Sequence, residues 1–253
     1  MDDVTCYLLD MDGVLVREDE PIPGAPEFVR RLQREGLAHL LLTNNPIHTP
    51  RTLASRLQAI DIPIGADRIW TSALATAWFL STQRPHGSAY VVGEAGLTTA
   101  LHEVGYTLVD RDPDYVVVGE TRTYSFEAIT RAIRLVDQGA RFVTTNPDPV
   151  APSPNGLVPA TGSVAAMVTA ATGVQPYPIG KPNPLMVRSA LRFVGAHSDE
   201  AVMVGDNMET DIIGGVESGL RSVLVLSGIT DRDQVQRHPF QPTRVVESVA
   251  ELV

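Results

Sequence analysis

Residues 7–13 read Tyr-Leu-Leu-Asp-Met-Asp-Gly, an apolar run that ends on two carboxylates one residue apart. The pattern predicts a short buried strand and then a turn at Gly13, because glycine tolerates the backbone conformations of tight turns. Asp10 and Asp12 are then expected at the carboxyl end of this strand, where ligands bind in open α/β sheets. An aspartate there can attack phosphorus, and a second acid two positions on can transfer a proton. A solvated Asp-rich turn would have the same residues, so this stretch alone leaves both interpretations open.

Two later stretches supply groups that suit a phosphate. Residues 39–45 read His-Leu-Leu-Leu-Thr-Asn-Asn, an apolar strand that ends at Thr43, whose hydroxyl and neighbouring backbone N–H groups can bind an anion. A helix cap or turn would use the same side chains. Residues 178–182 read Pro-Ile-Gly-Lys-Pro and predict a short strand that delivers Lys181, the only lysine of the sequence, as a point positive charge. The candidate phosphate ligands are Thr43, Asn44, Asn45 and Lys181.

A fourth stretch adds further carboxylates. Residues 201–211 read Ala-Val-Met-Val-Gly-Asp-Asn-Met-Glu-Thr-Asp, which places Asp206 after an apolar strand and Asp211 five residues later. Carboxylate oxygens suit Mg²⁺, which typically binds one or two carboxylates, waters and a substrate phosphate. Helix capping is the alternative role for Asp211. The candidate metal ligands are Asp10, Asp12, Asp206 and Asp211.

In this order the four motifs resemble those of the haloacid dehalogenase superfamily. Residues 42–44, 90–94, 118–122, 145–148, 179–182 and 226–228 look like its NagD-type branch, subfamily IIA, and the resemblance runs essentially from end to end. It implies a Mg²⁺-dependent phosphatase of small phosphomonoesters, including nucleoside monophosphates. It also implies an α/β fold, with a Rossmann-like core of parallel strands flanked by helices and an inserted α/β cap of the C2 type.

Alternating strand and helix signals agree with parallel α/β architecture. We expect a catalytic core from residues 1–84 and 177–253, and a cap from residues 85–176. The Pro-rich segment 146–159 is expected to be irregular. The predicted helices are 26–35, 49–60, 72–83, 96–104, 126–137 and 164–171, and the predicted cap strands are 89–92, 115–118 and 142–144.

Composition limits the partners. The net charge of −10 offers no general basic surface for a nucleic-acid polymer. No apolar stretch approaches the roughly 20 residues that a membrane span needs, and no signal-peptide pattern is present, so a cytoplasmic location is expected. The single cysteine, Cys6, is expected to be a buried strand residue. The expected partner is a small phosphorylated metabolite, and homo-oligomerisation stays open.

These residues suggest a mechanism for phosphoric monoester hydrolysis. Asp10 attacks phosphorus to give a phosphoaspartate, and Asp12 protonates the leaving alkoxide and later activates water. The cap would then choose the substrate through polar groups that follow its strands, although each of these side chains could equally serve only to stabilise a turn: Glu120, Arg122, Asn146 and Asp148.

Nucleoside 5′-monophosphates such as UMP and GMP are the first substrates expected. Sugar phosphates, glycerol phosphate, phosphoglycolate and 4-nitrophenyl phosphate are the alternatives, since acidic cap groups suit sugar hydroxyls as well as base amines. Asp12 argues against a dehalogenase use of the same core. Two functions of other classes stay open: a phosphomutase and a non-catalytic binding protein.

Overall fold

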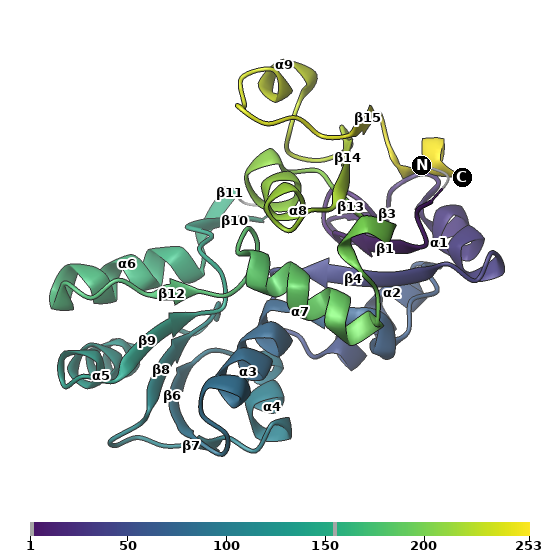
Figure 1. Ribbon diagram of the computed structural model, residues 1–253. Helices are drawn as coiled ribbons and strands as arrows, with labels where there is room; N and C mark the ends of the chain where they lie inside the picture. The colour runs from purple at the N-terminus through teal and green to yellow at the C-terminus, as the bar shows by residue number, and fades with distance from the viewer. Residues whose placement is uncertain (1–2, 154–155) are drawn as a thin grey trace. The chain divides into compact units, whose positions relative to one another are not determined.

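Parallel strands joined by helices make up most of the chain in the computed structural model, which describes residues 3–153 and 156–253 (Figure 1). Contacts between Cα atoms divide the chain into two units. The first comprises Met1–Thr43, Pro50–Trp70 and Lys181–Val253, and the second comprises Asn44–Thr49 and Thr71–Gly180. The assignment of residues 1–84 and 177–253 to a catalytic core and of 85–176 to a cap stays a prediction.

The first unit is built on a six-stranded sheet in the order β15-β14-β13-β1-β4-β5. The two strands at its centre, β1 and β13, are buried along their whole length and pair in parallel, with Leu9 opposite Val204. Continuous apolar runs are typical of parallel strands that are covered on both faces. The strands are β1 (Cys6–Leu9), β4 (Ala38–Thr43), β5 (Ile69–Thr71), β13 (Ala201–Gly205), β14 (Arg221–Val225) and β15 (Arg244–Val246).

Helices cover both faces of this sheet. Val202 and Val204 share a core with α1 (Ala25–Arg34) and α2 (Pro50–Ala59). Met203, which lies between those valines, faces Gly215 of the opposite layer. That layer contains α7 (Pro184–Val194) and α8 (Ile213–Glu217). The smaller elements are β2 (Val16–Arg17), β3 (Glu20–Pro21), α9 (Arg232–Val235), and the single turns η1 (Ala66–Arg68), η2 (Ser198–Glu200), η3 (Met208–Ile212) and η4 (Val249–Leu252).

The second unit has its own five-stranded sheet in the order β12-β9-β8-β6-β7, and all of its pairings are parallel. Helices α5 and α6 share an apolar core with one face, and α3 and α4 lie on the other face (Figure 1). The strands are β6 (Ser88–Val92), β7 (Thr107–Leu108), β8 (Tyr115–Val118), β9 (Arg141–Thr144) and β12 (Tyr177–Pro178), and the helices are α3 (Ser72–Gln83), α4 (Ala95–Glu103), α5 (Phe126–Asp137) and α6 (Thr161–Thr172).

Two sequence-based expectations are wrong. Segment 146–159 is not irregular, because it contains the antiparallel hairpin of β10 (Val150–Ser153) and β11 (Gly156–Pro159), with residues 154–155 outside the described part. The strand expected immediately before Lys181 ends at Pro178, and it joins the sheet of the second unit by pairing with β9. Within the described residues, no helix is long and apolar enough to cross a bilayer.

Cys6 gives a direct test of the central strand. Its side chain is fully buried in β1, and burial, with a smaller contribution from Glu200, raises the pKa of its thiol to about 11. Because the thiolate is the reactive form, iodoacetamide at pH 8 should leave native Cys6 unmodified for hours and alkylate it rapidly in guanidinium chloride. Mass spectrometry distinguishes the two states, and Cys6→Ala supplies the background. Rapid alkylation of the native protein would contradict the buried position of β1.

Candidate active site

The predicted motifs of the first unit converge at the carboxyl edge of its sheet. Asp10 follows β1, Asp206 follows the neighbouring strand β13, and Thr43 is the last residue of β4 on the other side of β1. The N–H of Asp10 donates to the carbonyl of Val204 at 2.9 Å, which continues the pairing of β1 with β13 by one residue. Residues almost 200 positions apart in sequence therefore meet where parallel α/β sheets bind ligands.

A buried lysine joins two of the carboxylates. Lys181 Nζ lies 2.5 Å from Asp10 Oδ1 and 2.6 Å from Asp211 Oδ1, and only 3% of Lys181 is exposed. The two carboxylates raise the pKa of Lys181 against the opposing effect of burial, which keeps its ammonium charged. A buried charge needs such partners because its desolvation penalty is several kcal/mol, roughly, when it is unpaired.

Asp211 is held at both oxygens. It lies in the π-helical turn η3, where its Oδ2 accepts the N–H of Asn207 at 3.1 Å while Oδ1 accepts from Lys181. A side chain at Gly205 would place a Cβ 2.1 Å from the Cβ of Asp211, so glycine at the end of β13 is what allows this close approach. These contacts fix the Asp211 carboxylate against the lysine.

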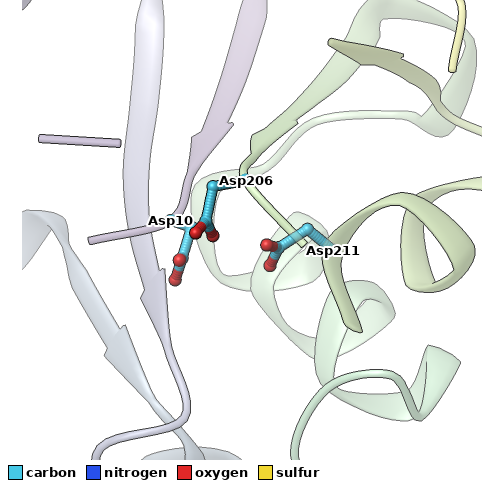
Figure 2. Close-up of side chains that lie close together, drawn as sticks. All are labelled: Asp10, Asp206 and Asp211. Atoms are coloured by element: carbon cyan, nitrogen blue, oxygen red, sulfur yellow. The ribbon is translucent and has the colours of Figure 1, made fainter. Parts of the chain in front are cut away.

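Asp10, Asp206 and Asp211 form a compact acidic group (Figure 2), with one oxygen of each lying within 4.8 Å of the others. Three carboxylates against one ammonium leave an excess of negative charge. Burial and the Asp211 carboxylate raise the pKa of Asp206 to about 7, and burial raises that of Asp10 well above its usual range although Lys181 opposes it. The donor set, all carboxylate oxygen, fits a hard divalent cation such as Mg²⁺.

The loop after β14 holds Asp206 in place and was not assigned a role from the sequence. The N–H of Ile229 donates to Asp206 Oδ2 at 2.7 Å, and the Ser227 hydroxyl donates to the carbonyl of Gly13 at 2.7 Å. A Cβ built on Gly228 would lie 1.9 Å from Asp206 Oδ2, and one on Gly13 would lie 2.3 Å from it. The Leu-Ser-Gly stretch at 226–228 is the sequence signal that could have identified this loop.

Asp12 and Thr43 differ in their surroundings. Asp12 is solvent-exposed, yet partial loss of hydration raises the pKa of its carboxyl while Lys181 acts in the opposite direction. Thr43 is buried, with 2% of its surface exposed. Their roles in proton transfer and phosphate binding stay predictions.

In the second unit, three of the predicted residues form one hydrogen-bond cluster. Asn44 Nδ2 donates to Asp148 Oδ2 at 2.9 Å, and Asn146 Nδ2 donates to the carbonyl of Asn44 at 3.0 Å. Asn45 makes a local turn instead, since its Oδ1 accepts the N–H groups of Ile47 and His48.

The remaining two predicted cap residues follow β8. Arg122 is exposed and Glu120 is half-buried. Sequence reasoning assigned no role to Glu94. Its carboxylate accepts from the hydroxyl of Thr121 and the N–H of Arg122, and it so holds the loop that carries both predicted residues. Glu94 is the residue before α4, two positions after β6 ends, and its approach to that loop is visible only once β6 and β8 are paired.

Family models match both ends of the chain. One, described as haloacid dehalogenase-like hydrolase, matches residues 7–107, and another, described as HAD-hydrolase-like, matches residues 178–252. They include every motif residue of the first unit.

Whole-length relatives agree with the family models. Dihydroxyacetone phosphatase of Corynebacterium glutamicum is 58% identical over 97% of this chain and 90% of its own. Ribonucleotide monophosphatase NagD of Escherichia coli is 42% identical over 97% and 96%. The solved structure of NagD from E. coli K-12 matches with a TM-score of 0.93 at 41% identity and covers 98% of both chains. The chain therefore belongs to the haloacid dehalogenase-like hydrolases, as a NagD-type phosphomonoester hydrolase.

Proposed function

We propose that this phosphatase hydrolyses small phosphomonoesters with Mg²⁺ through a phosphoaspartate on Asp10. The observation that carries the proposal is the buried Asp10 carboxylate, paired with the Lys181 ammonium at 2.5 Å and grouped with Asp206 and Asp211. A carboxylate nucleophile repels a phosphate dianion, by about 4 kcal/mol per pair of unit charges at 4 Å and an effective dielectric of 20, so compensating cations are required. The lysine supplies one of them.

Asp10 and Asp206, with the main-chain carbonyl of Asp12, would hold the metal ion, and Asp211 would bind it directly or through a water. When bound, Mg²⁺ would neutralise charge on the phosphoryl oxygens. The residues present fit this role because all the donors are oxygens and the carboxylates outnumber the ammonium.

The chain's own side chains carry the chemical steps. An oxygen of Asp10 forms a bond to phosphorus as the bond to the alkoxide breaks, and Asp12 gives that alkoxide its proton. Asp12 then takes a proton from water, the water oxygen attacks phosphorus, and the bond to Asp10 breaks to release phosphate. Lys181, the Thr43 hydroxyl and the backbone N–H groups of Asn44 and Asn45 bind the phosphoryl oxygens in both steps.

We propose the second unit as the cap that selects the substrate. Nucleoside 5′-monophosphates are the class expected from the sequence, and the ribonucleotide monophosphatase relative supports it. The 58% identity to a dihydroxyacetone phosphatase favours a second candidate, a three-carbon ketose phosphate. Phosphate release from UMP, GMP, dihydroxyacetone phosphate, glycerol phosphate and phosphoglycolate, measured at equal concentrations, would rank these classes.

Asp10→Asn tests the nucleophile. The amide is not a competent nucleophile, so Mg²⁺-dependent phosphate release should fall by about 10³-fold or more on every substrate of the panel. Rapid acid quenching of the wild-type enzyme should also trap a phosphorylated peptide that contains residue 10. Asp19→Asn, at an exposed carboxylate paired with Arg56, is the matched control and should keep full activity. A variant at position 10 that retains wild-type turnover would rule out the phosphoaspartate.

Gly228→Ala tests the metal site by displacing Asp206, one of the proposed metal ligands. The added Cβ would meet Asp206 Oδ2 and displace that carboxylate, so the Mg²⁺ concentration needed for half-maximal activity should rise about 10- to 100-fold. Activity should recover in part at high Mg²⁺. Ile229→Ala is the control, because it removes a mostly exposed side chain and keeps the N–H that binds Asp206. An unchanged Mg²⁺ requirement in Gly228→Ala would argue against Asp206 as a ligand.

A further inference from the structure

Asn44 is held from several sides by residues of the second unit. Its carbonyl accepts from the Ser72 hydroxyl at 2.7 Å and from Asn146 Nδ2 at 3.0 Å. Its side-chain amide donates to Asp148 Oδ2 at 2.9 Å. A Cβ on Gly180 would lie 2.6 Å from Asn44 Oδ1, so the glycine backbone bounds the other side of the same amide.

The contacts around Asn44 form a closed ring. Asn146 Oδ1 accepts the N–H of Asp148 at 3.1 Å, and Asn146 itself is 2% exposed. Asn44, Asn146 and Asp148 therefore restrain one another, and the bond to the Asp148 carboxylate is the charge-assisted one of the three, which makes it the strongest by type. Removing that carboxylate would leave the Asn44 amide without this acceptor.

Asn44 is also the residue joined directly to Thr43, the last residue of β4. Restraint of the side chain holds the Cα of Asn44, which bears its own N–H group, and restraint of the carbonyl holds the peptide plane that carries the N–H of Asn45. Preorganised N–H donors bind phosphoryl oxygens more strongly than mobile ones, because no reorganisation accompanies the reaction.

We infer that Asp148 is a positioning residue for phosphate binding, which acts through Asn44 and does not read the leaving group. This inference rests on the proposed function, in which the N–H groups of Asn44 and Asn45 bind phosphoryl oxygens. It replaces the expectation that Asp148 contacts the alcohol part of the substrate. The two roles differ measurably, since the phosphoryl group is common to all substrates and the leaving group is not.

The test compares Asp148→Ala with Asp148→Asn on 4-nitrophenyl phosphate, UMP and dihydroxyacetone phosphate, using those that the wild-type enzyme hydrolyses. The alanine variant should lose kcat/KM by the same factor, about 10- to 100-fold, on each substrate, because small misplacement of a binding group has effects of that size. Inhibition by inorganic phosphate should weaken in parallel. Asp148→Asn keeps an acceptor oxygen for the Asn44 amide and should recover most of the loss.

A double-mutant cycle identifies Asn44 as the route. Asn44→Ala keeps the backbone N–H and removes only the side chain that Asp148 holds. The double variant should therefore lose no more kcat/KM than the more impaired of the two single variants. Asp110→Ala, an exposed carboxylate of the same unit paired with Arg131, is the control and should match the wild type. Thermal unfolding of each variant shows which losses come from instability of the fold.

Three outcomes would overturn the inference. They are a loss that varies with the leaving group while phosphate inhibition is unchanged, unchanged kinetics in Asp148→Ala, and additive losses in the double variant. Failure of the phosphoaspartate mechanism is distinguishable from all three, because it would appear in Asp10→Asn and leave the binding of inorganic phosphate to the Asp148 variants interpretable.

Discussion

The paired charge of Lys181 is the constraint on which the candidate site depends. Its ammonium is almost fully buried, and its two short contacts reach Asp10 from the first strand and Asp211 from the turn after β13. Loss of Lys181 would leave both buried carboxylates without their cation, and breaking a buried ion pair typically costs about 3–5 kcal/mol. The central strands and the segment that starts at Lys181 must therefore fold together before any of the three groups is stable where it lies.

Glycines lie next to the carboxylates of the site, where a larger residue would overlap them. Gly205 admits Asp211, and Gly13 and Gly228 border Asp206, so glycine backbone lies close to both carboxylates. Backbone N–H groups from Asn207 and Ile229 then orient the carboxylates. The glycines leave room for the carboxylates, and the neighbouring N–H groups supply fixed dipoles of the kind that electrostatic stabilisation of phosphoryl transfer uses.

Local sequence signals were sufficient to predict the helices but not the contacts between residues that are distant in sequence. The ranges 72–83 and 126–137 coincide with α3 and α5 because Thr71 and Ser125 cap them, a pattern visible in the sequence. Strand β12 has only two residues, and nothing local states that it pairs with β9 of the second unit. The pairing of Asn44 with Asp148 spans 104 positions and depends on the whole fold. The motif order predicted the candidate site residues, but not that Lys181 would lie between Asp10 and Asp211.

Polar side chains of the second unit hold two different segments of its backbone. Asn146 and Asp148 engage the residue after Thr43, and Glu94 engages the backbone and hydroxyl of the loop after β8. In the proposed function, discrimination between leaving groups then falls to other side chains of this unit, such as the exposed Arg122. Relatives named as a dihydroxyacetone phosphatase and as a ribonucleotide monophosphatase align over nearly the whole chain. In the proposed function, the ring of Asn44, Asn146 and Asp148 holds the phosphate contacts, so changes in the loop after β8 can alter the substrate without altering that ring.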